Sequence, residues 1–509
     1  MDKNSERQDL RPAGYSALID MYGLDVIPNW HRSFVTDSGQ RRTASTEGIV
    51  EEFYPATYWP GETLADHLEF ALKYDGVNLA ILAALFEKVP EDDVLTYVRS
   101  KPTGKYARRI WFLYEFLTGK TLPLDDARQG NYVDLLDPDD YYTSSPARPS
   151  RRHRVNDNLL GNSQFCPLVR RTQTLRDFEK ADLADKSRRV VSTYPVALLR
   201  RASSYLYTKE TKSSFEIEHI RPTSNRVERF VAMLHLAEQQ DFCTKSQLIS
   251  VQNRIVDPRF AGEDYRSSQN YVGETVAWQR ERIHFVSPKP EDLPGLMEGM
   301  EDAHRRMTEG NVHPVIQAAA IAYGFVFLHP FDDGNGRIHR FLIHNVLARR
   351  GFTPEGLMFP VSAVMLKHPA DYDASLEAFS RPLMTLVDYS LDEEGRMTVR
   401  NDTAKWYRYI DMTPQAEALF HFIAQTIDTE LANELAFLAN YDRTKESIQA
   451  IVDMPDRMID LFIRFCLQNN GRISANKRKE HFESLSDSEI ARMEEVVRSA
   501  YGNKNILDE

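Results

Sequence analysis

A helix pattern with almost no polar face limits most strongly how this chain can fold. It covers residues 313–328, where aliphatic and aromatic side chains occupy nearly every direction around the helix axis. Such a helix is buried on nearly all sides, so other elements have to surround it. Residues 337–350 then repeat apolar side chains at helical spacing on one face. The sequence therefore predicts a buried helix, a short turn and a second helix.

The turn between these helices lies in the stretch HPFDDGNGRIHR, residues 329–340. Gly334 and Gly336 can adopt backbone angles that are closed to other residues, and they can bring their N–H groups close to a ligand. The helix that follows presents its free N–H groups and the positive end of its dipole at the same point. This arrangement predicts an anion-binding nest that suits phosphate.

Charged side chains around the nest extend this interpretation. Arg337 and Arg340 lie three residues apart on one face of the helix, and each guanidinium offers a fixed fork of donors to phosphate. The expected ligand therefore carries more than one phosphate. Asp333 is a natural oxygen ligand for Mg²⁺, which binds through one or two carboxylates and phosphate oxygens. His329 is placed to take a proton from an incoming hydroxyl.

Other kinds of site fit the stretch less well. Its glycines are not followed by Lys-Ser or Lys-Thr, so it is not a P-loop, and no strand with a third glycine in register precedes them. A metal hydrolase is the more serious rival, with candidate ligands His329, Asp332, Asp333, His339 and His344. Since His339 and His344 are five residues apart, they do not stack on one helical face.

The stretch is similar to the signature of the Fic family, H-x-F-x-[D/E]-G-N-G-R-x-x-R. The matching positions are His329, Phe331, Asp333, Gly334, Asn335, Gly336, Arg337 and Arg340. The resemblance implies a mainly helical core that transfers AMP from ATP to a hydroxyl side chain of a target protein. Related Doc-type kinases have lysine in place of the second glycine, so Gly336 argues against that activity.

The resemblance also implies a role for each residue of the signature. His329 would be the general base, Asp333 would bind magnesium, and Phe331 would anchor the loop in the core. The phosphates of ATP would be held by the remaining positions, Gly334, Asn335, Gly336, Arg337 and Arg340. Farther along the chain, Tyr372 is the candidate for a family tyrosine near the nucleotide base, with a buried core tyrosine as the alternative.

A second motif precedes the signature, in TKSSFEIEHI at residues 211–220. By itself it is typical of a surface helix with acidic residues. Beside a Fic signature, Ser214 and Glu218 resemble the inhibitory motif [S/T]-x-x-x-E-[G/N], with His219 in the place of the last residue. The resemblance implies that Glu218 pairs with Arg340 and blocks productive binding of the outer phosphate, since a carboxylate competes with phosphate for arginine. We therefore expect an autoinhibited enzyme.

Residues 262–290 alternate β-forming residues with turn residues and predict a hairpin. The family resemblance implies that this hairpin, near residues 265–287, is a flap over the active site. It would align an extended segment of the target by main-chain pairing, which needs little target sequence specificity.

The whole chain of 509 residues is long enough for two or three domains. We expect a helical N-terminal region at 1–145, a Fic domain at 146–400 and a C-terminal helical domain at 401–509. Hydrophobic and charged contents of 42% and 27% are ordinary for soluble proteins. The charged N-terminus shows no secretory signal, and the apolar runs are too short to span a membrane.

Three widely separated cysteines fit a reducing compartment and exclude a Cys-based zinc site. We therefore expect a cytoplasmic protein. The net charge of −12 argues against a general nucleic-acid coat. The expected partners are ATP and a protein substrate, and a homo-oligomer is left open.

Two functional alternatives remain. The same site could remove AMP or transfer another nucleotide or phosphate group. Alternatively, the Fic centre could serve a regulator whose C-terminal tail binds DNA, with phosphate contacts from Arg472, Lys477, Arg478 and Lys479. A helical packing or dimerisation domain is the interpretation that we favour for the tail.

Overall fold

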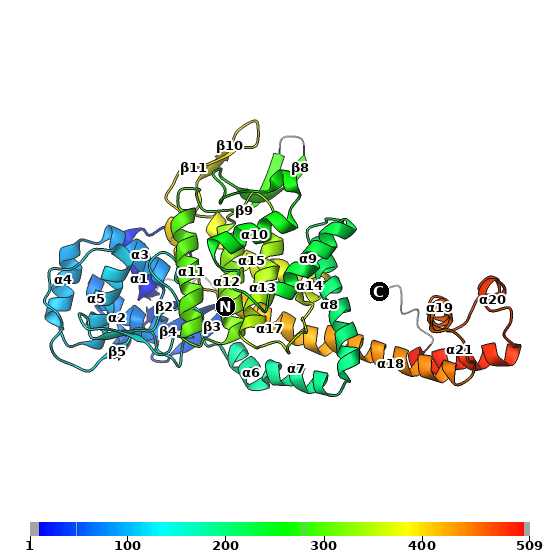
Figure 1. Ribbon diagram of the computed structural model, residues 1–509. Coiled ribbons are helices and arrows are strands. Elements are labelled where there is room, and N and C mark those ends of the chain that lie inside the picture. Colours follow the sequence, from blue (N-terminus) through cyan, green and yellow to red (C-terminus); the bar gives the residue numbers. More distant parts are fainter. Residues whose placement is uncertain (1–9, 47, 278–279, 503–509) are drawn as a thin grey trace, which may run out of the picture. The chain divides into compact units, whose positions relative to one another are not determined.

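The computed structural model describes residues 10–46, 48–277 and 280–502. The described chain is mainly helical with small sheets, which confirms the predicted fold class (Figure 1). It divides into two compact units. The large unit holds the residues up to Ala181 together with Thr211–Phe352 and Met365–Phe422; the small unit holds Asp182–Glu210, Thr353–Val364 and the residues from Ile423 on. These units are defined by contacts and do not correspond to the expected domains, so the domain boundaries expected at 145 and 400 stay predictions.

The N-terminal part of the large unit contains several helices, and also a sheet that was not part of the expected helical region. Its helices are α1 (Tyr15–Tyr22), α2 (Leu64–Phe70), the π-helical η2 (Ala71–Asp75), α3 (Leu79–Lys88), α4 (Glu91–Ser100) and α5 (Lys105–Thr118). The sheet has the order β1-β2-β4-β3, formed by Arg11–Ala13, His31–Thr36, Ile49–Pro55 and Arg42–Thr46. Strands β2 and β4 are parallel, and the other pairs are antiparallel.

Shorter elements complete the large unit up to Ala181. They are the 3-10 helix η1 (Ala56–Tyr58), a small sheet of order β5-β7-β6 from Val133–Asp134, Val155–Asp157 and Arg148–Ser150, and helix α6 (Gln173–Ala181).

The centre of the large unit is built around the predicted apolar helix, α12 (Pro314–Leu328). Of its fifteen residues, only Pro314 and Val326 are not buried, as the absence of a polar face requires. Helix α12 packs against α11 (Leu293–Glu309) and α13 (Asn335–Arg349), and α13 also contacts α9 (Ser224–Leu236) and α10 (Lys245–Ile255). The remaining elements are η3 (Pro258–Phe260), α15 (Pro369–Met384), α16 (Ala404–Arg408) and α17 (Thr413–Gln425). The predicted helix, turn and helix are therefore present.

Two hairpins belong to the large unit. Strands β8 (Tyr271–Ala277) and β9 (Arg280–Val286) form the hairpin predicted near residues 265–287, and residues 278 and 279 of that prediction lie outside the described residues. Strands β10 (Tyr389–Leu391) and β11 (Met397–Val399) form the second hairpin. Helix α15 contacts β9, so the first hairpin has a helix beside it.

The small unit is helical. Its elements are α7 (Leu183–Ser192), α8 (Val196–Glu216, of which Thr211 onward belongs to the large unit), α14 (Val361–Lys367, up to Val364), η4 (Thr426–Leu431), α18 (Ala432–Gln449), α19 (Asp456–Leu467), α20 (Ala475–His481) and α21 (Asp487–Tyr501). Ser486 caps α21 in a reciprocal pair with Glu489. Among the described residues, no helix combines the length and the apolarity that crossing a bilayer requires.

Candidate functional site

His329 lies where α12 ends. Its backbone is left-handed, with φ of 48°, and its N–H still bonds to the carbonyl of Phe325 at 2.9 Å. Its ring Nδ1 lies 3.2 Å from the carbonyl oxygen of Val326. A carbonyl only accepts hydrogen bonds, so Nδ1 carries the proton and Nε2 keeps its lone pair. Burial lowers the pKa of His329 to about 4. The ring is therefore a neutral imidazole that can accept a proton.

This lowered pKa gives a testable pH dependence. A ring with a pKa of about 4 holds its extra proton only below that pH, so the base form is complete from roughly pH 6 upward. For a reaction in which His329 is the base, we expect the acid limb of the profile of kcat/KM against pH to lie near pH 4. For an unperturbed histidine it would lie at about pH 6.5. The measurement is kcat/KM against pH, with circular dichroism at each pH to verify the fold. An acid limb near 6.5 in folded protein would contradict the assignment.

The turn after His329 is held by Asn335. Its side-chain oxygen accepts from the N–H of Phe331 at 3.0 Å, and its side-chain nitrogen donates to the carbonyl of Phe331 at 2.6 Å. Phe331 is 2% exposed, so the loop is anchored in the core. Both polar atoms of the Asn335 side chain therefore bind this loop, and its backbone N–H is free for a ligand. Gly334 has φ of 93°, which a side chain would oppose.

The beginning of α13 presents unpaired donors. Within the described residues, the N–H groups of Asn335, Gly336 and Arg337 make no hydrogen bond, and the first closed helical bond is from the N–H of Ile338 to the carbonyl of Gly334 at 2.9 Å. Three free N–H groups at the positive end of a helix dipole form the predicted anion nest.

Two fully buried guanidinium groups flank the nest. Arg337 lies 2.7 Å from Asp333 and donates to the carbonyl of Ile255 at 3.1 Å. Arg340 donates to the side-chain oxygen of Ser214 at 2.8 Å and to its carbonyl at 2.6 Å. Buried charges require partners, and these contacts supply part of that need.

Glu218 is a further partner of the two guanidinium groups, because its carboxylate pairs with both Arg337 and Arg340. One carboxylate oxygen lies 2.7 Å from Nε of Arg337, and the other lies 2.7 Å from an NH group of Arg340. A Cβ on Gly336 would come within 2.5 Å of Glu218, so the carboxylate rests directly on the first turn of α13. The pairing expected from the sequence involved Arg340 alone. The carboxylate therefore occupies the two guanidinium groups that flank the nest.

His219 occupies the position at which the inhibitory motif has glycine or asparagine. Its φ is 56°, in the left-handed region that those two residues tolerate best. Helix α8 ends at Glu216, and the turn that follows directs Glu218 toward α13. The chain thus keeps the left-handed turn of the motif despite the substitution.

Tyr372 lies beside Arg340 and is 6% exposed. Its hydroxyl is 3.4 Å from an NH group of Arg340, and its ring lies near those of His339 and Phe422. The observed contact is therefore with Arg340, and the expected role of Tyr372 near a nucleotide base stays a prediction.

Arg266 is a residue that sequence reasoning missed. It is 5% exposed, its Nε donates to the carbonyl of His329 at 2.8 Å, and its backbone N–H donates to the carbonyl of Pro330 at 2.8 Å. Its guanidinium also donates to the carbonyls of Ser268 and Pro288, and burial lowers its pKa to about 10. Arg266 ties the base of the β8–β9 hairpin to the His329 loop. No local pattern distinguishes it from a surface arginine.

The ligand set of a metal hydrolase does not assemble. Within the described residues, no three of His329, Asp332, Asp333, His339 and His344 bring their ligand atoms together. His339 is fully buried beside Tyr323, and burial lowers its pKa to about 3. Asp333, whose side chain is 42% exposed, is the carboxylate that could reach a metal bound to phosphate.

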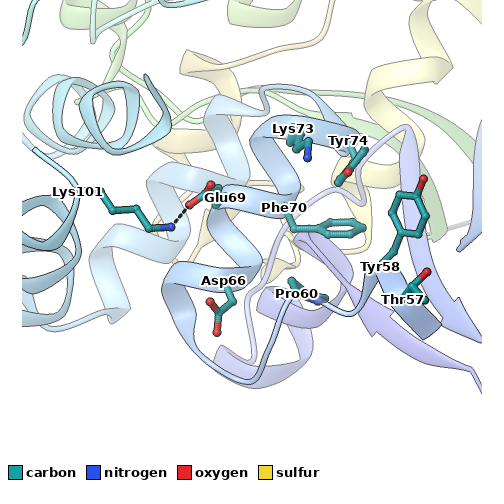
Figure 2. Close-up of a pocket in the computed structure, with 9 residues that line it drawn as sticks. All are labelled: Thr57, Tyr58, Pro60, Asp66, Glu69, Phe70, Lys73, Tyr74 and Lys101. Carbon is teal, nitrogen blue, oxygen red and sulfur yellow. Dashed lines mark hydrogen bonds and ion pairs between the residues drawn. The ribbon is translucent and has the colours of Figure 1, made fainter. Parts of the chain in front are cut away.

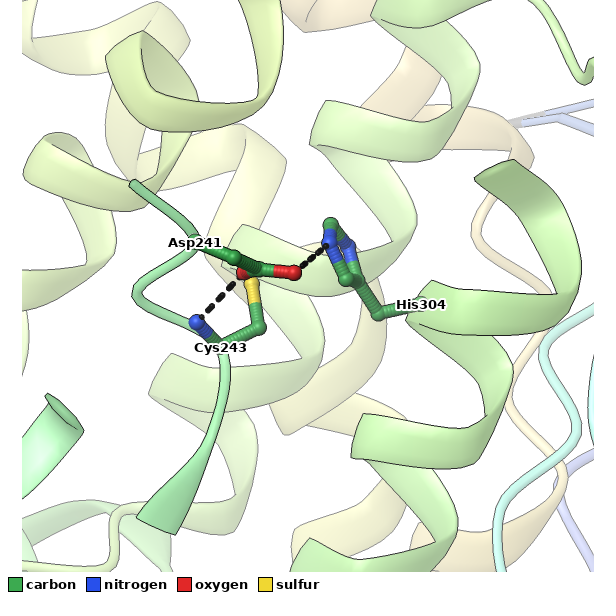
Figure 3. Close-up of side chains that lie close together, drawn as sticks. All are labelled: Asp241, Cys243 and His304. Carbon is green, nitrogen blue, oxygen red and sulfur yellow. Dashed lines mark hydrogen bonds and ion pairs between the residues drawn. The ribbon is translucent and has the colours of Figure 1, made fainter. Parts of the chain in front are cut away.

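The fold brings one cysteine into a group of metal-ligating side chains that the sequence spacing did not indicate. Asp241, Cys243 and His304 have ligand atoms within 4.8 Å of one another (Figure 3). His304 Nε2 lies 3.2 Å from Asp241. Gln317 turns its amide nitrogen to His304 Nδ1 at 3.1 Å, while its amide oxygen accepts from Arg350.

This arrangement fixes the tautomer of His304. A nitrogen that faces an amide N–H must accept, so the proton lies on Nε2, which donates it to Asp241. A metal ion at Nε2 would need the opposite tautomer, with an acceptor at Nδ1. We therefore interpret the group as a hydrogen-bonded contact between the 241–243 loop and α11.

A separate pocket of about 390 Å³ lies in the N-terminal part of the chain. Figure 2 shows its lining, in which Lys101 pairs with Glu69 at 2.6 Å beside the rings of Phe70, Tyr58 and Tyr74. None of the candidate site residues from the sequence lines this pocket.

In a comparison with known protein families, residues 242–347 match the Fic/DOC family. A protein adenylyltransferase Fic of Aedes aegypti is 37% identical over 122 residues, which is 23% of this chain and 22% of that protein. A protein adenylyltransferase Fic of Nematostella vectensis is 33% identical over 127 residues, 24% of this chain and 27% of that protein. The chain thus spans about a quarter of the length of these relatives. A Fic family protein from Desulfovibrio desulfuricans aligns with 62% of this chain and 85% of its own, at 17% identity and a TM-score of 0.36.

Proposed function

Because this chain carries a Fic/DOC family domain, we propose that it is a protein adenylyltransferase, which transfers AMP from ATP to a serine, threonine or tyrosine hydroxyl of a target protein. One observation supports this most. Three free N–H groups begin α13, and the two buried arginines beside them both pair with Glu218. That site matches an anion with several charged oxygens, as a polyphosphate has.

In the proposed reaction, Nε2 of His329 takes the proton from the target hydroxyl as its oxygen attacks the α-phosphorus of ATP. The bond from that phosphorus to the bridging oxygen breaks, and pyrophosphate leaves with the electron pair. Donors at the start of α13, with Arg337 and Arg340, stabilise charge on the phosphate oxygens. We propose that Asp333 holds Mg²⁺, which would neutralise phosphate charge when bound. Asp333 fits this role because its carboxylate is half exposed beside the nest.

We further propose that Glu218 inhibits the enzyme by occupying this site. Its carboxylate forms ion pairs with both arginines, and Arg337 also holds Asp333 at 2.7 Å. Phosphate can bind productively only after these ion pairs exchange. Ser214 supports the same contact, since it fixes Arg340 through two hydrogen bonds.

The decisive experiment follows the fate of labelled ATP. The purified protein is incubated with a protein extract and with ATP labelled either at the α- or at the γ-phosphate. We expect protein-bound label from α-labelled ATP and none from γ-labelled ATP. Label from γ-labelled ATP would instead identify a phosphate transferase. Release of AMP from premodified protein, without addition, would identify an enzyme that removes AMP.

The DNA-binding alternative receives no support from the C-terminal helices. Lys477 pairs with Glu480 at 3.0 Å and Arg478 pairs with Asp487, so these two cations are neutralised within the chain. We retain the interpretation of a helical packing domain and propose a cytoplasmic location. Cys166, Cys243 and Cys466 are buried free thiols, which a reducing compartment would preserve.

A further inference from the structure

A pocket opens beside His329 on the side of the hairpin. Its volume is about 290 Å³, which exceeds what a serine or threonine side chain needs. Its walls come from the hairpin strands β8 and β9, from the end of α12 and from one face of α15. A side chain that enters this pocket therefore lies next to the proposed general base.

One part of the wall is apolar. Phe285 and Phe327 are almost fully buried and form an aromatic cluster with Phe379. Val272 of β8 and Leu376 of α15 add aliphatic surface, and Val272 is 42% exposed. Exposed apolar surface at a pocket mouth favours a ligand with an apolar stem.

The α15 side of the pocket is acidic. Asp373 and Glu377 stand one helical turn apart and both line the pocket. Glu377 pairs with Arg381, whereas Asp373 has no hydrogen bond or ion pair with another residue of the described chain. Partial burial and the neighbouring Glu377 raise the pKa of Asp373, and the nearby His284 opposes this shift. His284 on β9 is engaged with Glu274 at 3.4 Å.

A long aliphatic stem that ends in a cation satisfies both parts of the wall. Lysine and arginine bury their methylene groups along apolar surface and keep the charged head at a polar rim. The aromatic rings add attraction for a cation. A neutral side chain would leave the Asp373 carboxylate without a partner, and an acidic one would be repelled.

We propose that this pocket binds a lysine or arginine of the target protein next to the modified hydroxyl, and that Asp373 is the residue that selects it. The inference rests on the proposed function. In an extended segment, side chains two residues apart point to the same side, about 7 Å from each other. A target segment that lies along the hairpin would therefore place its hydroxyl at His329 and its basic residue, two positions away, in the pocket.

The test uses the full chain, α-labelled ATP and synthetic peptides. Each peptide carries a serine, threonine or tyrosine, with either lysine or glutamate two residues before and after it. We expect kcat/KM for the lysine peptides to exceed that for the glutamate peptides by about tenfold or more. In Asp373→Lys this ratio is expected to fall to about one or to invert. Because both peptides are measured on the same variant, a loss of folded protein cancels from the ratio.

Asp371→Lys is the matched control, since it makes the same charge change on α15 at a residue that does not line the pocket. Its ratio should stay that of the unmodified chain. Equal rates with both peptides, a ratio unchanged in Asp373→Lys, or transfer to the protein itself with none to any peptide would overturn the inference and leave AMP transfer in place. Absence of label from every peptide and from the protein itself would overturn the proposed function instead.

Discussion

Replacing His329 by alanine is expected to lower AMP transfer by about 10²–10⁴-fold, the range that a positioned general base contributes. The reason is the tautomer of the ring. With Nδ1 bonded to the carbonyl of Val326, Nε2 is the atom that can receive the hydroxyl proton. The measurement is the initial rate of label transfer from α-labelled ATP.

The His329 prediction needs a control for the loss of an imidazole in general. His368, a half-exposed residue that precedes α15, provides it, and His368→Ala should keep full activity. Binding of ATP to His329→Ala should also persist, because the nest and the arginines are intact. Transfer at an undiminished rate by His329→Ala would exclude it as the base.

Replacing Glu218 by glycine is expected to raise AMP transfer, or modification of the protein itself, by at least about tenfold. Glu218 accepts a charge-assisted hydrogen bond from Arg340 and forms an ion pair with Arg337. A hydrogen bond to a charged group is worth about 1.5–3 kcal/mol, and each 1.4 kcal/mol of competition lowers phosphate binding about tenfold. Removing the carboxylate frees both arginines and the first turn of α13. The measurement is the same transfer assay.

In thermal unfolding, the Glu218→Gly variant should be less stable than the unmodified chain without ATP and should gain more stability when ATP is added. Without ATP, two buried guanidinium groups lose a partner, which destabilises the fold by up to about 3–5 kcal/mol. With ATP, the phosphates replace the carboxylate, and ligand at 100 times its Kd restores about 2.7 kcal/mol. A larger ATP-induced rise in Tm for Glu218→Gly than for the unmodified chain is therefore expected.

Glu216→Gly is the matched control for the Glu218 prediction. Glu216 is the last residue of α8 and is exposed, so this change removes a carboxylate and adds glycine flexibility at the same turn. Its transfer rate should match that of the unmodified chain. Equal activation by both variants would assign the effect to the turn and not to the carboxylate of Glu218.

The double pairing of Glu218 adds a second contact to the proposed inhibition. A contact with Arg340 alone would obstruct one phosphate position. The contact with Arg337 also connects Glu218, through that guanidinium, to Asp333. Departure of Glu218 would therefore release the arginines and alter the charge around the proposed magnesium ligand together.

Much of the site follows from local sequence. The apolar face of α12 requires its burial, and the glycines with the new helix start after them produce the anion nest. Arg337 and Arg340 share a face because they are three residues apart. These are consequences of helix periodicity and of backbone freedom, which act over a few residues, and the family resemblance then assigned a chemistry to them.

Other elements could not be predicted in this way. The strand β3 is exposed along its whole length and so lacks the alternation that reveals a strand. The resemblance gave Asn335 a place at the phosphates without saying which of its groups would act, and its side chain binds the backbone of Phe331. A short polar side chain has several partners within reach, and packing of the loop decides among them.

The sequence by itself determined which groups we propose for binding a polyphosphate, because the signature places them within twelve consecutive positions. Only the tertiary structure decided that Glu218, 122 residues before Arg340, bridges both arginines, that Arg266 supports the His329 loop, and that Asp373 makes no hydrogen bond or ion pair with another described residue. Contacts between distant segments depend on how helices pack, and helix packing is set by the sum of many side-chain contacts that no local pattern records.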